Sequence, residues 1–170
     1  MLDSNFSKLS REELLVLCSK SINTMDGTWF ISVEDKFGFD IAMEIDMEVW
    51  RRYSLSHAWK LLKIFEIDKA DPITAIVELV QSDPLKFAWK SEIMAQSHDK
   101  AIIRRMVCPP QEGRLRAAKK LFPGYRICQT MYDSFAETID SNIKVSCLSN
   151  PPCTFRQNYW CEWQFEIQSG

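Results

Sequence analysis

The sequence has few of the residues, and none of the short motifs, that mark the common catalytic classes. It contains two histidines in 170 residues, which argues against a Cys–His dyad or a histidine-rich metal site. Its five glycines form no glycine-rich phosphate loop, and neither Gly-x-Ser-x-Gly nor His-Glu-x-x-His occurs. Six cysteines are present without any Cys-x-x-Cys pair. These absences exclude a phosphate-binding loop, a serine-hydrolase elbow and a zinc-protease helix.

Long apolar runs are also missing. No segment approaches the ~18 consecutive apolar residues of a membrane-spanning helix, and residues 1–5 show neither a basic leader nor an apolar secretory run. We therefore expect a cytoplasmic protein with its cysteines as reduced thiols. A formal net charge of −2 gives no general attraction to nucleic acid or to an anionic membrane, so neither is expected as a partner.

Aromatic side chains are abundant. Six Trp and ten Phe are many for this length, and a chain of this size buries roughly two-thirds of its unfolded surface. The rings can therefore fill a core and also line a pocket. Because no repeat, linker or low-complexity segment interrupts the chain, we expect residues 1–170 to form one domain.

Periodicity predicts helices in the first half. Ser10 and Glu13 form a capping box, and an apolar stripe at three- and four-residue steps follows it. Cys18 belongs to this stripe, so we expect it in the core as a small residue. Asp26-Gly27 is expected to break the helix, and a short second helix is predicted over residues 29–37.

The helix predicted over residues 41–65 carries two rows of side chains. The apolar row is expected to face the core: Ile41, Ile45, Val49, Ala58, Leu61, Leu62 and Phe65. The second row, also at helical spacing, is Ala42, Asp46, Trp50, Tyr53 and His57. This second row either lines a binding cleft or forms a solvated flank with Trp50 folded onto the core. Asp46 favours the cleft, because its neighbours in the row are uncharged.

The period of the sequence changes to two after the fourth helix, which begins at Pro72. The pattern then predicts strands over residues 87–96 and 101–107, helices over 114–122 and 125–139, and strands over 143–147 and 160–167. His98 falls in the first turn, and Cys128 on the core side of the last helix. Helices first and antiparallel strands later indicate an α+β domain. We expect the N-terminal helices to pack on a four-stranded antiparallel sheet made of two hairpin-like strand pairs separated by helix.

The last two strands bring cysteines together. Cys147 and Cys161 lie on the apolar faces of their strands, Cys161 together with Trp163, and antiparallel pairing would place both thiols at the same end of the sheet. A zinc or iron site made from these two with Cys108 and Cys153 is conceivable, because all four lie at strand ends or in loops. The close cysteine spacing typical of such sites is missing. We therefore favour a thiol-lined pocket wall and expect no cofactor.

Charged residues offer further candidates for the site. Arg104 and Arg105 point to opposite faces of their strand, so at least one faces water or pairs with an acid. Arg104 and Arg114 are candidates to hold a ligand carboxylate, with a solvated sheet face as the alternative for the strand residue. Cys108 lies beside the basic segment that contains Arg114, which favours a lowered thiol pKa, but no base for it is evident.

Several motifs resemble a known family. In the first half they are Asp26-Gly27-Thr28-Trp29-Phe30, Val33-Glu34, Phe37-Gly38, Glu44-Ile45-Asp46 and Val49-Trp50. In the second half they are Cys108-Pro109 with Gln111 and Arg114, then Cys147, Pro151-Pro152 and residues 160–165. Over residues 10–167 this pattern resembles a family of uncharacterised prokaryotic cytosolic proteins. It is more distantly similar to the L-2-amino-thiazoline-4-carboxylic acid hydrolase-like proteins.

These resemblances imply two kinds of function. The hydrolase-like proteins open the ring of a small heterocyclic amidine acid with water, and Cys108, Arg114, Cys147 and Cys161 stand in the matched motifs. The element order and the ending Cys161-x-Trp163-x-Phe165 also resemble vinyl-reductase-type and trafficking-particle ligand-binding domains. Those domains enclose small or hydrophobic ligands between helices and sheet, and their resemblance also implies a homodimer.

Two hypotheses about function follow. The first is a small-molecule-binding, sensory module whose pocket is walled by Asp46, Trp50 and Tyr53 from the long helix and by Trp89, Cys147, Cys161 and Trp163 from the sheet. The second is a hydrolase of a small cyclic amide or amidine. In it, Asp46 or Glu34 is the general base and Arg104 or Arg114 holds a substrate carboxylate. We favour binding, because it requires only a cavity.

Overall fold

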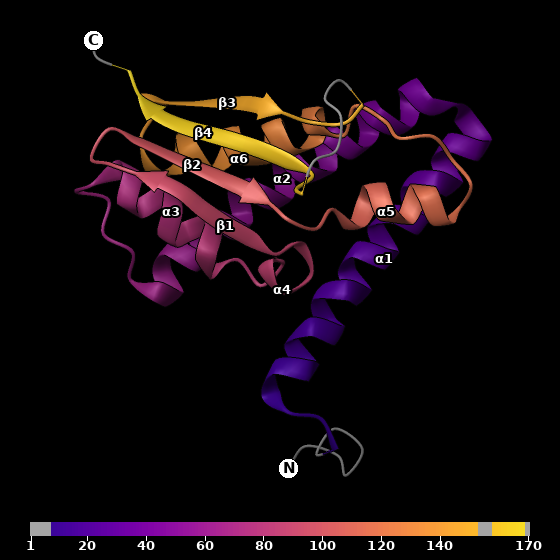
Figure 1. Cartoon of the computed structure of the whole chain (residues 1–170), viewed down its shortest axis with the longest axis horizontal. Coiled ribbons are helices and arrows are strands. Elements are labelled where there is room, and N and C mark those ends of the chain that lie inside the picture. The colour runs from indigo at the N-terminus through magenta and orange to yellow at the C-terminus, as the bar shows by residue number, and fades with distance from the viewer. Residues whose placement is uncertain (1–7, 153–157, 169–170) are drawn as a thin grey trace.

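The computed structural model describes residues 8–152 and 158–168, which form six helices and one four-stranded antiparallel sheet (Figure 1). The helices are α1 (Arg11–Phe37), α2 (Phe39–Phe65), α3 (Pro72–Ser82), α4 (Lys86–Trp89), α5 (Pro109–Arg116) and α6 (Tyr125–Ile139). The strands are β1 (Ser91–Gln96), β2 (Lys100–Arg105), β3 (Ile143–Ser149) and β4 (Cys161–Ile167). The predicted α+β class is therefore confirmed.

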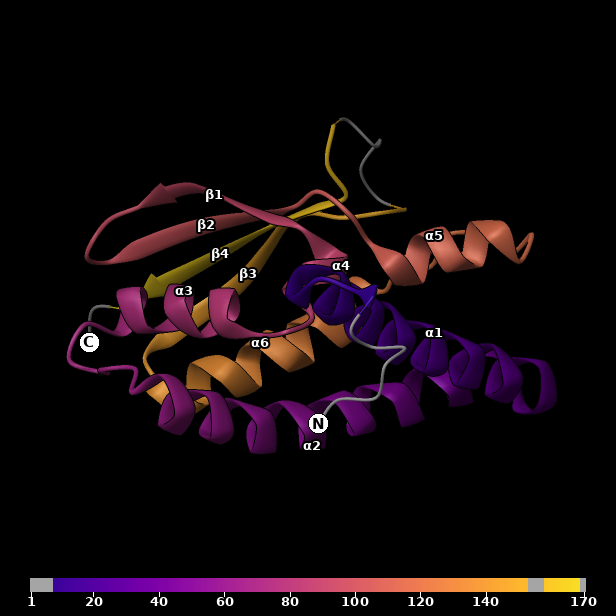
Figure 2. The same ribbon diagram turned by 90° about the horizontal axis from the view of Figure 1, so that it is seen from below.

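The sheet has the order β1-β2-β4-β3, so the two hairpin-like pairs join through β2 and β4. Trp163 in β4 lies opposite Ile103 in β2 and opposite Cys147 in β3. In Figure 2 the sheet lies above α3 and α6, and α2 runs below them. The core lies between the sheet and these helices, because alternate residues of β2 and β4 are buried on that side. No helix of the described residues is long and apolar enough to cross a membrane.

The first helix is longer than predicted. The capping box is confirmed, since the Glu13 amide donates to Ser10 Oγ at 3.2 Å and the Ser10 amide donates to Glu13 Oε2 at 2.8 Å. The predicted break at residues 26–27 is wrong, because α1 runs unbroken to Phe37. A glycine inside a helix lowers stability by only about 1 kcal/mol relative to alanine. The packing of α1 before and after Gly27 offsets this loss. Gly38 follows the last helical residue and is the C-cap of α1, and its φ of 91° favours glycine.

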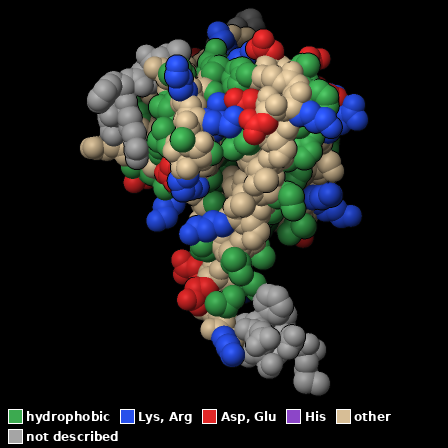
Figure 3. All heavy atoms as spheres, turned by 90° about the vertical axis from the view of Figure 1, so that its right-hand side faces the viewer, with side chains coloured by type: hydrophobic (Ala, Val, Ile, Leu, Met, Phe, Trp, Pro, Cys, Tyr) green, Lys and Arg blue, Asp and Glu red, His purple; other side chains and the backbone are tan. Residues whose placement is uncertain are grey.

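The buried side of α1 is polar. The expectation that Cys18 lies in the core is wrong, because it is exposed together with Leu17, Ile22 and Met25 from the same stripe. The buried residues of α1 are instead Ser19, Asn23 and Phe30. Their burial has a physical reason: Ser19 Oγ donates to the Leu85 carbonyl at 3.2 Å, and Asn23 Oδ1 accepts the Trp89 indole N–H at 2.8 Å. Figure 3 shows hydrophobic side chains on the surface of the part of α1 that projects from the body.

The two rows of side chains on α2 also face the opposite directions from those predicted. Ile41, Ile45, Val49 and Phe65 of the predicted core row are exposed. Most of the second row is the buried side, since Ala42, Asp46 and Trp50 are all buried. The interpretation of this row as a solvated flank is therefore wrong for Asp46, although Trp50 packs in the core and Tyr53 is exposed, as that interpretation expected. Ala58, Leu61 and Leu62 are buried as expected.

Two boundaries in the middle of the chain differ from the prediction. Residues 86–89 form the short helix α4, so β1 begins only at Ser91. Helix α5 begins at Pro109 rather than at residue 114, because prolines suit the first turn of a helix, where their missing N–H is not needed. Cys108 is thereby the N-cap residue of α5. His98 is an exposed turn residue, as predicted, and Cys128 packs partly buried against the core.

Candidate functional site

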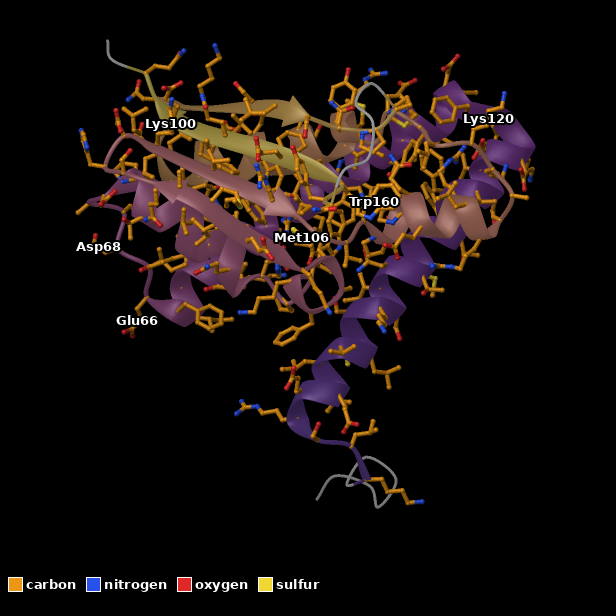
Figure 4. All side chains as sticks on the ribbon, in the orientation of Figure 1. Glu66, Asp68, Lys100, Met106, Lys120 and Trp160 are labelled. Atoms are coloured by element: carbon orange, nitrogen blue, oxygen red, sulfur yellow. The ribbon has the colours of Figure 1, made fainter. Side chains whose placement is uncertain are left out.

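A cavity of about 670 Å³ lies at the end of the sheet where β2 ends and β4 begins. Helices α1, α2, α5 and α6 wall it, together with α4 and the start of β4. Trp160, labelled in Figure 4 beside Met106, lies at this end of the sheet and lines the cavity. Segments that are far apart in the sequence therefore meet around this one cavity.

The cavity contains about half of the site residues that the sequence predicts. Those that line it are Asp46, Trp50, Cys108, Arg114, Cys161 and Trp163. Those that do not are Glu34, Tyr53, His57, Arg104 and Cys147. Cys153, which belonged to the conceivable metal site, lies outside the described residues. The cavity thus joins the long helix to Cys161 at the end of the sheet, without the Cys147 that the predicted thiol wall included.

Two carboxyl groups meet in the cavity wall, Asp46 from α2 and Asp26 from α1. The two carboxyl groups lie close enough to share a proton, and the Trp50 side chain lies beside Asp26. Asp46 is 2% exposed. We call Asp26 and Asp46 the carboxyl pair.

Burial sets the protonation of the carboxyl pair. Desolvation raises the pKa of Asp46 to about 8, and the charge of Asp26 adds to this rise. Desolvation raises the pKa of Asp26 to about 6, against the lowering effect of its hydrogen bonds with Trp50 and Asp46. Near neutral pH the pair therefore holds about one proton, because two ionised carboxylates in contact repel each other.

One acceptor of the carboxyl pair is unsatisfied. Oδ1 of Asp46 is buried and accepts no hydrogen bond from an N–H or hydroxyl donor of the described residues. Buried polar atoms are nearly always hydrogen-bonded, so such an atom beside a cavity indicates a place for a donor from outside the protein. The unsatisfied oxygen and the shared proton together make this wall the polar end of the cavity.

The opposite wall carries thiols. Cys108, Cys128 and Cys161 line the cavity, and the Trp163 indole N–H donates to Cys161 Sγ at 3.2 Å. Burial raises the pKa of Cys108 to about 12 and raises that of Cys161 as well. The expected lowering of the Cys108 pKa is therefore wrong, because desolvation outweighs the basic segment. These thiols stay protonated at neutral pH and serve as apolar wall rather than as nucleophiles.

The metal interpretation gains no support from the geometry. Among residues 8–152 and 158–168, no group of three or more His, Cys, Asp or Glu side chains is arranged to hold a metal ion. Cys147 lies apart from the cavity, with its Sγ accepting from Asn150 Nδ2 at 3.4 Å.

Glu34 and Arg114 pair with each other. Arg114 Nη1 and Nη2 donate to the two Glu34 oxygens at 2.6 and 3.2 Å, and Nε donates to the Lys120 carbonyl at 2.9 Å. The guanidinium also lies 4.8 Å from the Phe122 ring centre. Hydrogen bonds from Arg114 lower the pKa of Glu34. Glu34 is therefore an ionised partner of Arg114 and lies outside the cavity. It does not have the position of the general base that the sequence suggested.

The remaining candidates lie elsewhere. Tyr53 stacks on His57 with ring centres 4.8 Å apart, and His57 Nε2 lies 3.5 Å from Asp83 Oδ1. Arg104 is on the outer face of β2, where it pairs with Glu162. Arg105 is the buried member of the two arginines, and its Nε donates to the Tyr132 hydroxyl at 2.7 Å. Neither Arg104 nor His57 is placed to touch a ligand in this cavity.

Asp26 lines the cavity but is not among the site residues that the sequence predicts. The sequence predicts a helix break at this residue. A helical spacing nevertheless includes it, because Ser19, Asn23, Asp26 and Phe30 follow one another at steps of four, three and four residues. These steps trace one side of a helix. Three of the four residues are polar, so the row does not stand out as a core stripe.

Comparisons with known proteins find one family. A family profile described as a family of unknown function (DUF6125) matches residues 5–167. No curated protein and no solved structure matches the chain. What the protein does therefore has to be inferred from the geometry of the cavity.

Proposed function

The chain belongs to DUF6125, a family of unknown function, and from its cavity we propose that it is a cytoplasmic module that binds a small molecule. The observation that carries the proposal is the cavity itself, whose volume of about 670 Å³ is within the roughly 300–1,000 Å³ of small-molecule sites. Aromatic rings from Phe30, Trp50 and Trp89 supply apolar wall. The carboxyl pair supplies the few polar groups that orient a ligand in such sites. The cavity thiols are not in disulfides, which suits a reducing compartment.

Filling the cavity is expected to abolish binding without unfolding the protein. Gly27 lines the cavity, and a Cβ added there would meet no atom within 4 Å. Gly27→Leu therefore places apolar bulk in the hollow while it removes a helical glycine. We expect neutral indole-sized compounds, screened by ligand-observed NMR, to bind the wild type at least about tenfold more tightly than Gly27→Leu, a difference of ~1.4 kcal/mol.

Gly27→Ala is the matched control, because its methyl group removes the glycine and leaves most of the cavity open. It should keep the binding of the wild type. Equal binding by Gly27→Leu and Gly27→Ala would place the compounds on the surface and reject the proposal, as would a panel in which no compound binds.

A second candidate function is a hydrolase of a small cyclic amide or amidine, and the carboxyl pair is the observation that favours it. One ionised and one protonated carboxyl group are the two partners that such a reaction needs. The carboxylate would take a proton from a water molecule as its oxygen forms a bond to the amidine carbon. The protonated partner would give its proton to the ring nitrogen as the carbon–nitrogen bond breaks. The pair ends with one proton, as it began.

The hydrolase candidate predicts turnover that depends on both carboxyl groups. We expect ring opening of 2-amino-thiazoline-4-carboxylate, followed by NMR, to be lost in Asp26→Asn and in Asp46→Asn, since each removes either the base or the acid. Glu44→Gln, at an exposed position of the same helix as Asp46, should keep the rate. Absence of turnover by the wild type would remove this candidate and leave the binding proposal standing.

A further inference from the structure

We propose that the ligand of the cavity carries a protonated amine, and that the Asp26–Asp46 carboxyl pair binds this ammonium group. The inference rests on the proposed binding function and names the chemical class of its ligand. Three observations carry it: the charges around the cavity, the unsatisfied oxygen of Asp46, and the aromatic rings of the wall.

The charges of the cavity wall leave the carboxyl pair without a counter-ion. Arg114 is neutralised by Glu34, Arg116 lies 3.9 Å from Glu112, and Lys20 is exposed to solvent. Neither Asp26 nor Asp46 forms an ion pair with any described residue. A buried anion is costly unless it is paired. A cation in the cavity would remove this cost, whereas an anionic ligand would increase it.

The hydrogen-bonding capacity of the pair fits an ammonium group. Oδ1 of Asp46 is an unsatisfied acceptor, and an ammonium group has three donors and no acceptor. When it binds, the shared proton is no longer needed, and both carboxylates can accept from the ligand. A hydroxyl group could satisfy Oδ1 but would leave the negative charge of the pair uncompensated.

The rings near the pair favour a cation and accept an apolar body. Trp50 lines the cavity beside Asp26. Trp89 lines it too, but the Arg105 guanidinium already lies 5.3 Å from the centre of its ring. Indole faces attract cations within about 6 Å of their centres. The cavity continues past these rings to the thiols of Cys108 and Cys161. An amine attached to an apolar or aromatic body therefore matches both ends.

Three indole probes that share a ring and differ in charge test the inference. They are tryptamine (cationic), tryptophol (neutral) and indole-3-propionate (anionic), titrated by calorimetry at pH 7. We expect tryptamine to bind at least about tenfold more tightly than tryptophol, and indole-3-propionate to bind most weakly. The double variant Asp26→Asn/Asp46→Asn should remove the preference for tryptamine while it keeps the affinity for tryptophol, because a single Asp→Asn change still leaves one ionised carboxylate. Glu44→Gln should keep the preference, which excludes a general effect of net charge.

The outcomes separate the inference from the proposed function. Equal binding of tryptamine and tryptophol would overturn the ammonium site and leave the binding function in place. If none of the three probes binds, both fail. A preference for tryptamine that survives in the double variant would place the cation elsewhere and overturn the inference. If the double variant does not fold, calorimetry of the wild type in buffers of different ionisation enthalpy decides the matter. Tryptamine should release the shared proton when it binds, and binding without proton release would overturn the inference.

Discussion

Glu34→Gln is expected to lower the free energy of unfolding by about 3 kcal/mol, the usual cost of removing one partner of a buried ion pair. The guanidinium of Arg114 would stay in place, 7% exposed, with its charge uncompensated. The substituted side-chain amide can accept only one of the two hydrogen bonds that the Glu34 carboxylate accepts from Arg114. Urea denaturation followed by circular dichroism measures the loss.

The neighbouring Asp35 provides the control for this substitution. It pairs with Lys119 at 2.7 Å, but its side chain is 64% exposed. Exposed pairs contribute about 0–1 kcal/mol, so Asp35→Asn should change little. A loss below about 1 kcal/mol in Glu34→Gln, the range of exposed pairs, would contradict the structural role of Glu34 and return it to the candidates for catalysis.

The same ion pair predicts the behaviour of the protein in acid. The folded state lowers the pKa of Glu34 below its usual value of 4.5. Its contribution to stability is therefore present above pH 4.5 and is lost as the pH falls through the folded pKa. Glu34→Gln should remove this part of the acid sensitivity.

Asp46→Asn is expected to raise the free energy of unfolding at pH 8 by about 2 kcal/mol, from the linkage between proton binding and folding. The folded state raises the pKa of Asp46 from 3.8 to about 8, so it binds the proton more tightly than the unfolded chain does. The wild type should be most stable below pH 3.8 with respect to this group, and should lose stability as the pH rises towards 8. A tenfold change in proton affinity corresponds to ~1.4 kcal/mol, so even part of this shift gives the expected effect.

Asparagine in place of Asp46 cannot ionise, so the variant should lose much less stability between pH 5 and pH 8. Glu44→Gln is again the matched control, because it removes a charge from the exposed side of α2. Urea denaturation at both pH values checks the prediction. If the wild type is equally stable at pH 5 and pH 8, Asp46 is ionised in both states, and the protonation of the carboxyl pair described above is wrong.

Stability and function are expected to change in opposite directions at Asp46. The substitution that stabilises the fold at pH 8 should also weaken the preference for a cationic ligand, because it removes one of the two carboxylates that can accept from the ligand. Such a trade-off is common where a binding site keeps a polar group under strain.

Some features of this protein follow from the sequence because their causes are local. The capping box at Ser10 and the Asp71 cap before Pro72 each depend on hydrogen bonds that span three residues. The strand pairs follow from a period of two, which places Cys161 and Trp163 on one face of β4. These local patterns are sufficient for the α+β class and for the thiol end of the pocket.

The sides of α1 and α2 that face the interior were decided by tertiary structure. Their most apolar stripes, at Ile22 and Met25 and at Ile45 and Val49, lie on the surface. A helix buries the side whose apolar groups its neighbours can contact and whose polar groups they can hydrogen-bond. For α1 this side includes Asn23, because Trp89 of α4 donates a hydrogen bond to it. No local pattern contains that information.

The sequence alone therefore determined the fold class and the order of most elements and made Asp46 a candidate site residue, because periodicity and spacing are properties of neighbouring residues. Only the tertiary structure brought Asp26 of α1 to Asp46 of α2, separated Glu34 from the cavity by pairing it with Arg114, and left one carboxylate oxygen unsatisfied. Pairing and desolvation depend on groups that are distant in the sequence. In this protein, pairing and desolvation decide which charged and polar groups line the cavity.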